Sequence, residues 1–308
     1  MEVVSATKMR RNQQFALAAR PYAVASLEMM QNLFSRTPAD LLPSLLTPRE
    51  IKRSCLVVVT SDKGLAGAFN GNVIKKAESQ INQYKVLRRP YILITVGKKA
   101  KEHFERSGIA IARSFWKFGD YTDLSETLPI ADFLLAGFQD GRWDSVEAVY
   151  TNFRTTLLQE TVMKKILPAT EEGLEDAVRS ILPERGKYAA LSPRHSERSE
   201  ESQDPSSRQI GTQDDAVVRK YNYEYKFEPS PAEIFETLVP QLIKMHIHHI
   251  ILESNASEHS ARMVAMKNAS DNARELIGDL TLEFNKARQA TITRELVEIT
   301  AGAEQINL

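Results

Sequence analysis

The C-terminal stretch of the chain, from Gln241 to Leu308, contains no proline and only two glycines, Gly278 and Gly302. Most of its other residues favour the α-helix. At a rise of 1.5 Å per residue, one continuous helix of this length would be about 100 Å long, which is far longer than a globular helix needs to be. The stretch therefore predicts a rod that extends beyond any small domain.

Apolar and small residues recur along this predicted rod in alternating steps of three and four, which is the pattern of a coiled-coil seam. They are Met263, Met266, Ser270, Ala273, Ile277, Leu280, Phe284 and Ala287. The seam is then displaced and resumes as Ile292, Leu296, Ile299, Ala303 and Ile306, and such a break locally alters a supercoil. The seam favours pairing with a second helix, and its small residues permit a close approach.

A similar stripe occurs near the start of the chain. It consists of Phe15, Ala18, Tyr22, Ala25, Met29 and Leu33, spaced three or four apart. Pro21 lies inside this stripe and predicts a bend, because proline removes a helical hydrogen bond. We expect the two terminal helices to pair with each other. The alternative is that both pack on the central region as ordinary surface helices.

The region between the two ends alternates between strand-like and helix-like segments. Apolar, β-rich runs predict strands at 54–61, 91–96, 146–152 and 161–168. Helices are expected at 70–84, 98–107 and 124–140. This alternation predicts crossover connections and a mostly parallel sheet. An alternating aromatic run at 221–227 predicts an added edge strand before the long helix.

One stretch, Ser192–Asp215, contains Ile210 as its single large aliphatic residue and has no aromatic residue. It cannot bury enough apolar surface to offset the entropy of ordering, so we expect a disordered loop. The predicted organisation is a coiled coil of residues 1–36 and 230–308, an α/β domain of residues 50–190 and 216–229, and a disordered polar insertion at 191–215.

Charge and composition exclude several classes of protein. The chain has 40 Lys and Arg residues against 40 Asp and Glu residues, which argues against a dedicated nucleic-acid binder. No apolar run approaches the length that a membrane-spanning helix needs, so no transmembrane segment is predicted, and Met1–Arg11 lacks the pattern of a secretory leader. The single cysteine, Cys55, excludes an internal disulfide and a cysteine-cluster metal site, and fits a reducing cytosol.

The segment that follows the first strand is the place where a nucleotide-binding loop would lie. Its turn motif consists of Asp62, Gly64, Gly67 and Asn70. The two glycines are three residues apart, so the GxGxxG pattern is absent, and no Lys-Ser or Lys-Thr follows as a P-loop requires. We therefore expect a tight turn that opens a helix.

Three histidines, His246, His248 and His249, lie close together in the predicted rod. Two of them share a helix face, but no acidic residue lies within the cluster, so we expect solvated or interface histidines. Cys55 lies in a buried type of strand, where thiols are usually inert. No GxSxG motif is present. The sequence thus predicts no catalytic centre, cofactor site or metal site.

Three motifs, in order along the chain, resemble the gamma subunit of F-type ATP synthases. The C-terminal signature is carried by Ala256–Leu282, Asn285–Thr293 and Glu295–Gly302. The segment Ser61–Asn70 is similar to the central motif of that family, with Ala66 where a cysteine is often found. Met1–Asn12 and Ala19–Tyr22 resemble its N-terminal helix. The resemblance covers nearly the whole chain except the polar insertion.

The resemblance implies a rotor shaft, built as an antiparallel coiled coil of the two terminal helices beside a mostly parallel, Rossmann-like α/β domain. Such a shaft couples proton-driven rotation of the membrane c-ring to ATP synthesis, or to hydrolysis in reverse, at beta-subunit sites. The implied partners are alpha and beta subunits in a 3:3:1 ratio with gamma, the epsilon subunit and the c-ring. The chain would be no enzyme on its own, and would lie at the cytoplasmic face of the bacterial inner membrane.

The same resemblance assigns roles to two groups of residues. Arg288, Gln289 and Thr293 are expected to contact a beta-subunit loop, and the alternative for Arg288 is a solvated coil position. The second group, Lys8, Arg10 and Arg11, matches the basic group of the family's first helix. Its alternative is a solvated helix face.

Two departures from the family pattern accompany this resemblance. Met1 aligns with an internal methionine of the first helix, so about 22 residues, or six turns, are expected upstream of a misplaced start codon. The insertion at 192–215 lies in the region of a regulatory insert in photosynthetic relatives, but it contains no cysteine for a dithiol switch. Two other classes remain open: an unrelated coiled-coil α/β scaffold, which would not co-purify with alpha and beta subunits, and a nucleotide-binding enzyme.

Overall fold

The computed structural model describes residues 2–18, 42–118, 122–155, 158–170 and 230–306, together with residues 25, 29, 33, 37, 173 and 228. Three predicted features lie outside these residues: the bend at Pro21, the strand at 221–227 and the disorder of 191–215. Nothing in the described part of the chain bears on them.

A five-stranded sheet forms the centre of the molecule, with the strand order β3-β2-β1-β4-β5. Its strands are β1 (Ser54–Val59), β2 (Tyr91–Val96), β3 (Ile111–Phe115), β4 (Ser145–Phe153) and β5 (Gln159–Leu167). β1 pairs in parallel with β2 and β4, β2 pairs in parallel with β3, and only β5 is antiparallel. The prediction of a mostly parallel sheet is confirmed. β3 is the strand that the sequence pattern missed, because it is a short edge strand with polar residues and no apolar run.

The helices cover both faces of the sheet. α3 (Phe69–Val86) and α4 (Lys98–Arg106) pack on one face against Leu56 and Val58 of β1. α5 (Leu124–Gln139) and the first part of α8 (Pro231–Ile306) pack on the other face, against Cys55 and Val57. Because successive β1 side chains point to opposite faces, its continuous apolar run serves both cores.

α8 is one helix of 76 residues, about 114 Å long, and it begins ten residues before the proline-free stretch. Ser230 supplies its N-terminal cap: the Oγ accepts from the Glu233 backbone nitrogen at 3.3 Å and donates to the Glu233 carboxylate at 3.0 Å. Pro240 lies inside the helix without ending it. The buried residues Phe235, Val239 and Ile243 are four apart, so one stripe of the helix covers the sheet.

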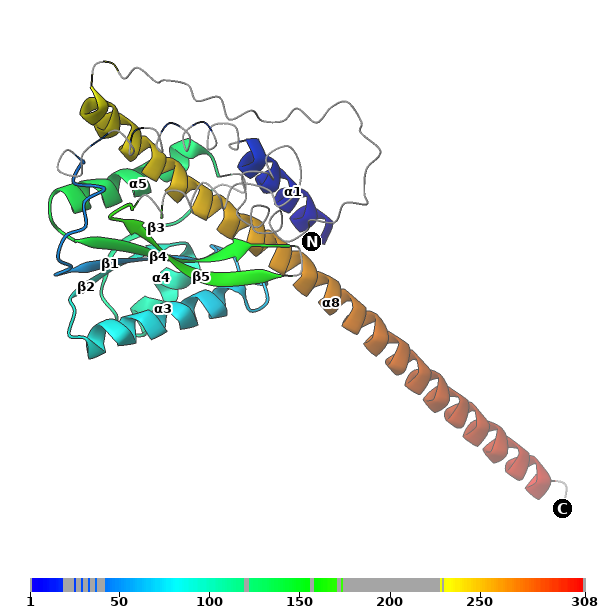
Figure 1. Ribbon diagram of the computed structural model, residues 1–308. Helices are drawn as coiled ribbons and strands as arrows, with labels where there is room; N and C mark the ends of the chain where they lie inside the picture. Colours follow the sequence, from blue (N-terminus) through cyan, green and yellow to red (C-terminus); the bar gives the residue numbers. More distant parts are fainter. Residues whose placement is uncertain are drawn as a thin grey trace, which may run out of the picture.

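α1 (Glu2–Ala18) runs antiparallel to α8 and packs along it (Figure 1). The pairing of the terminal helices is therefore confirmed. The predicted stripe began at Phe15, but the buried side chains of α1 include Ser5, Met9 and Asn12. A search for apolar residues misses this face, because two of its three members are small or polar.

Beyond Lys267 the long helix leaves the body of the molecule as a free rod (Figure 1). From Lys267 to Ile299 every described side chain is exposed except Asn285, which is half-buried. The exposed residues include the predicted seam residues Ile277, Leu280 and Phe284, which no described segment covers. Even so, none of the described helices combines the length and apolar character needed to span a bilayer.

Candidate functional site

The turn motif after β1 is a compact, internally bonded loop. The Asn70 carboxamide oxygen accepts from the backbone nitrogen and the hydroxyl of Ser61, each at 3.0 Å. The two carboxylate oxygens of Asp62 accept from the backbone nitrogens of Lys98 and Lys117, each at 2.8 Å. Asp62 and Asn70 thus hold together the carboxyl ends of neighbouring strands.

Glycine suits one position of this turn, and the turn is hydrogen-bonded to α8. Gly67 has φ +55°, a conformation that side chains with a Cβ rarely adopt, and a Cβ added there would lie 3.9 Å from that of Ala265. The Arg262 Nε donates to the carbonyl of Gly64 at 3.2 Å, and its Nη2 donates to the carbonyl of Lys63 at 3.4 Å. Two backbone carbonyls of the turn therefore bind the side chain of Arg262 in the long helix.

Arg262 also pairs with Glu258 one turn earlier, with 2.5 Å between the guanidinium Nη2 and the carboxylate. Burial raises the pKa of Glu258, while Arg262 opposes the rise. Glu258 and His259 line a cavity of about 60 Å³ with Asp62 of the turn. In dinucleotide-binding folds the crevice at the carboxyl ends of the strands holds the ligand. In this chain, side chains of α8 occupy the corresponding crevice.

Two further hydrogen bonds anchor α8 to the sheet domain. The Ser257 hydroxyl donates to the carbonyl of Thr151 at 3.2 Å, and the Asn255 amide donates to the Thr122 hydroxyl at 2.5 Å. Ser257 is fully buried. We call the turn Ser61–Asn70 and the α8 segment Asn255–Ala265 together the shaft–domain junction.

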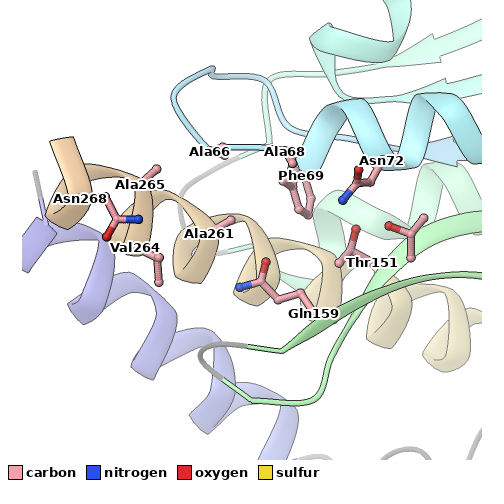
Figure 2. Close-up of a pocket in the computed structure, with 12 residues that line it drawn as sticks. Ala66, Ala68, Phe69, Asn72, Thr151, Gln159, Ala261, Val264, Ala265 and Asn268 are labelled. Atoms are coloured by element: carbon pink, nitrogen blue, oxygen red, sulfur yellow. The ribbon is translucent and has the colours of Figure 1, made fainter.

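A larger cavity of about 290 Å³ lies beside this junction, between the turn, α8 and the ends of β4 and β5. Figure 2 shows Asn72 of α3, Thr151 and Gln159 of the strands and Asn268 of α8 around it. Its lining is uncharged and is built largely from alanine, amide and hydroxyl side chains. Such a lining offers hydrogen bonds to neutral polar groups but no charge to hold a phosphate.

The three clustered histidines are interface residues, so the solvated alternative is wrong for them. His246 and His249 are buried, and the His248 ring nitrogen Nδ1 lies 3.0 Å from the Thr127 hydroxyl of α5. Burial lowers the pKa of His246 to about 3 and that of His248 to about 4. His249 lies 3.1 Å from the carboxylate of Glu253, an acidic partner just outside the cluster.

The remaining chemistry-bearing residues show no catalytic arrangement in the described part of the chain. Cys55 is fully buried, and burial raises its thiol pKa well above the usual range, as expected for an inert cysteine. Among the described residues, no group of three or more His, Cys, Asp or Glu side chains is placed to hold a metal ion.

The residues assigned by family resemblance lie on the rod and on α1. Arg288, Gln289 and Thr293 are all exposed on the free rod, where the Thr293 hydroxyl donates to the Gln289 carbonyl at 2.8 Å. In the basic group of α1, Lys8 is half-buried, and Arg10 and Arg11 are exposed. The structure thus separates the rod residues from the junction along α8.

Sequence reasoning did not single out Arg262, Glu258, Ser257 and Asn255, which fasten the shaft to the domain. The available signal was a run of polar residues on a helix face that the apolar stripe predicts to be buried. Ser254–Ser260 is polar apart from one alanine, although it continues a helix stripe that is buried against the sheet. Buried polar residues in a helix require partners, and the partners here are backbone carbonyls and a neighbouring hydroxyl.

Comparison with known proteins shows which family this chain resembles. A family model described as ATP synthase matches residues 1–306. The ATP synthase gamma chain of Chloroflexus aurantiacus (strain ATCC 29366 / DSM 635 / J-10-fl) is 37% identical over 305 residues, which are 98% of this chain and 90% of the relative. The gamma chain of Gloeothece citriformis (strain PCC 7424) is 36% identical over 310 residues, which are 99% of this chain and 93% of the relative.

A solved structure has the same fold. It is a chain of the Tetrahymena thermophila mitochondrial ATP synthase central stalk and c-ring, with a TM-score of 0.54 and 18% identity. The likeness covers 88% of this chain and 97% of the other. The family model and the relatives extend over nearly the whole sequence, so the chain belongs to the ATP synthase gamma chain family.

Proposed function

We propose that this chain is the rotating central shaft of an F-type ATP synthase. In this role it couples proton-driven rotation of a membrane c-ring to ATP synthesis, or to hydrolysis in reverse, at beta-subunit sites. The observation that carries the proposal is α8, a single helix that is fastened to the sheet at its base and free beyond Lys267. Membership in the gamma chain family leaves no support for an unrelated scaffold protein.

A shaft must transmit torque from its base to its tip. At the base, the Arg262 guanidinium, the Ser257 hydroxyl and the Asn255 amide bond to three different segments of the α/β domain. A rotation of the domain about the axis of α8 therefore pulls on several short bonds at once. The buried stripe that includes Phe235 and Ile243 adds apolar packing over the sheet.

The free rod has the surface expected of a part that turns inside a protein sleeve. Ile292, Leu296 and Ile299 are exposed near its tip. Apolar contacts are non-directional, so they do not lock the rod at one angle as a set of fixed ion pairs would. The zero formal charge of the chain agrees with this role.

Among the polar residues of the rod, three are our candidates for contact with a beta-subunit loop. Arg288, Gln289 and Thr293 lie within two turns of one another on the exposed rod. Their side chains can form and release hydrogen bonds as the shaft passes each beta subunit. Lys8, Arg10 and Arg11 of α1 form a second polar group beside the base, which we assign to the same alpha–beta ring.

The proposed assembly contains three alpha and three beta subunits around this shaft, with the epsilon subunit and the c-ring at its base. The chain itself would carry no catalytic site and would lie at the cytoplasmic face of the bacterial inner membrane. We propose residues 1–36 and 230–308 as the shaft, residues 50–190 and 216–229 as the α/β domain, and 191–215 as a polar insertion between them.

Reconstitution with alpha and beta subunits tests this proposal directly. The three purified subunits are mixed, the complex is isolated by size exclusion, and its MgATP hydrolysis is measured. A shaft yields a complex with one copy of this chain and an ATPase activity above that of alpha and beta alone. Rotation of a bead attached to an engineered surface cysteine on the α/β domain would then be seen in single molecules.

A truncated variant that ends before Lys267 provides the control, because it keeps the junction but lacks the rod. It should fail to enter the ring and leave the activity of alpha and beta unchanged. The proposal is wrong if the full chain also elutes alone, or if the truncated and full chains stimulate hydrolysis equally.

A further inference from the structure

The two edges of the parallel sheet differ in what they carry. The carboxyl edge meets α8 at the shaft–domain junction. The amino edge lies at the end of the molecule away from the tip of the rod (Figure 1). Ser54 of β1 pairs with Tyr91 of β2 and Ser145 of β4, so the residues that precede these three strands lie side by side.

Basic residues gather along this amino edge. They are Lys52, Arg53, Lys85, Arg88, Arg89 and Arg142, and all are exposed except Arg89, which is half-buried. Two backbone bonds fix the segments next to one another: Ser54 nitrogen to the Pro90 carbonyl at 3.0 Å, and Asp144 nitrogen to the Arg53 carbonyl at 2.8 Å. We call these six residues, with Val86 and Leu87, the basic edge.

The nearby carboxylates offset only part of this charge. Asp144 pairs with Arg49 at 3.0 Å, outside the basic edge, and also accepts from two backbone nitrogens. Asp140 pairs with Arg142 at 3.1 Å. Lys85, Arg88 and Arg89 form no ion pair or side-chain hydrogen bond with the described residues.

Two apolar side chains project between these cations. Val86 is 82% exposed and Leu87 is 64% exposed. The turn that presents them is well ordered by its backbone: Leu87 nitrogen donates to the Gln83 carbonyl and Arg89 nitrogen to the Tyr84 carbonyl, each at 2.9 Å. Arg88 adopts φ +50° within this turn. The result is a fixed loop with an apolar tip and basic flanks.

We propose that the basic edge binds the anionic headgroups of a phospholipid membrane. Lysine and arginine near a negatively charged bilayer are drawn to its surface potential, and exposed apolar side chains enter the boundary between headgroups and acyl chains. The carboxylates of an acidic protein loop would satisfy the cations, but they offer no apolar medium for Val86 and Leu87. The combination of both features on one loop favours the lipid surface.

The inference goes beyond the rotor function and does not depend on it, because the isolated chain can be tested. Full-length protein is mixed with vesicles of phosphatidylcholine alone, or of equal parts phosphatidylcholine and phosphatidylglycerol, and floated on a density gradient. The protein should float with the anionic vesicles at low salt and be released at high salt. Vesicles of phosphatidylcholine alone should bind at least tenfold less.

Charge reversal then locates the surface. Each cation near a bilayer contributes about fivefold to binding, so Arg88→Glu with Arg89→Glu should lower binding at least tenfold. Val86→Ser with Leu87→Ser should also weaken it. Lys75→Glu with Lys76→Glu, on the exposed side of α3, is the matched control and should change binding little.

A further variant separates the basic edge from the apolar rod, which could itself adsorb to lipid. Leu280→Ser with Phe284→Ser removes two exposed apolar side chains of the rod and should leave binding intact. The proposal is overturned if this rod variant loses binding while Arg88→Glu with Arg89→Glu retains it. Equal binding to both kinds of vesicle also overturns it. The proposal is also overturned if soluble polyglutamate competes for the basic edge equally well in the wild type and in Val86→Ser with Leu87→Ser. That result would indicate an acidic protein partner.

Discussion

Glu258 and Arg262, one turn apart on α8, form a buried ion pair with 2.5 Å between a carboxylate oxygen and the guanidinium Nη2. The same guanidinium donates to the carbonyls of Gly64 and Lys63, in the turn after β1. One side chain thus neutralises a buried acid and ties the shaft to the domain. The pair is therefore a point where stability and torque transmission depend on the same atoms.

Removal of Arg262 should be far more costly than removal of an exposed arginine. Arg262→Ala leaves Glu258 buried without its cation and two turn carbonyls without a donor, so we expect a loss of about 3–5 kcal/mol in unfolding free energy. Urea unfolding followed by circular dichroism measures this loss. The matched control is Arg274→Ala on the rod, where the pair with Asp271 is exposed and should contribute less than about 1 kcal/mol. Similar losses for the two variants would contradict the role given to Arg262.

Acid should weaken the packing of α8 on the sheet through His246. Burial, with the positive charges of Lys164 and His249 nearby, lowers its folded-state pKa to about 3, while the unfolded chain titrates near 6.5. The unfolded state therefore binds more protons between these values, and stability falls as pH drops below about 6.5. At pH 5 the loss from this one group is about 2 kcal/mol.

The test compares the pH dependence of unfolding in the wild type and in His246→Gln. The variant has no ionisable group at this position, so its stability should fall less steeply between pH 6.5 and pH 4.5. His248, whose pKa burial lowers to about 4, contributes in the same direction and remains in both proteins. Parallel stability curves for the two proteins would show that His246 does not resist protonation.

Two glycines should respond in opposite directions to alanine. A Cβ at Gly137 of α5 would collide with the Trp143 ring, so Gly137→Ala must displace a buried tryptophan and should cost about 1–3 kcal/mol or more. A Cβ at Gly278 on the rod meets nothing within 4 Å, and Gly278→Ala should stabilise the helix by about 0.5–1 kcal/mol. Thermal unfolding measures the first effect, and amide hydrogen exchange around residue 278 measures the second. Faster exchange in Gly278→Ala would contradict a continuous helix there.

The polar residues of the rod should matter only in the assembled enzyme. Arg288→Ala with Gln289→Ala removes exposed side chains, so the unfolding free energy of the isolated chain should change by less than about 0.5 kcal/mol. In the complex with alpha and beta subunits, loss of hydrogen bonds to a charged group should lower ATPase activity or assembly affinity at least tenfold. Asp279→Ala, another exposed rod residue, is the control. Equal effects of both changes in the complex would refute a specific contact at 288 and 289.

The sequence allowed the long helix, four strands and three crossover helices to be predicted, because each has a sustained period or an apolar run. The short edge strand β3 was missed, since Ile111–Phe115 alternates between apolar and polar residues and has only one neighbour. The proline-free pattern begins only at Gln241, ten residues after the start of α8. Pro240 lies inside α8, where the cap at Ser230 and packing over the sheet outweigh its lost hydrogen bond.

The shaft–domain junction was only half predictable. The glycines and Asn70 indicated a tight turn, because such residues suit turns whatever their surroundings. The partner of that turn, Arg262, lies far along the chain from Gly64 and has no local signature. Pairing across such a distance is fixed by tertiary packing alone. The buried face of α1 was hidden for a similar reason, since Ser5 and Asn12 are buried only because α8 lies over them.

The placement of α8 also sets the order in which the chain can fold during synthesis. The face of the sheet that carries Cys55 and Val57 is covered by Phe235, Val239 and Ile243, which leave the ribosome only after the whole segment between β5 and α8. Until then, among the described residues, this apolar face is shielded by α5 and by Leu33, Leu45 and Leu46. α1 can pack only later still, because its antiparallel partner α8 is the last of the described helices to be synthesised. Between the synthesis of β5 and that of α8, the nascent chain is therefore an incomplete sandwich that is open to aggregation or chaperone binding.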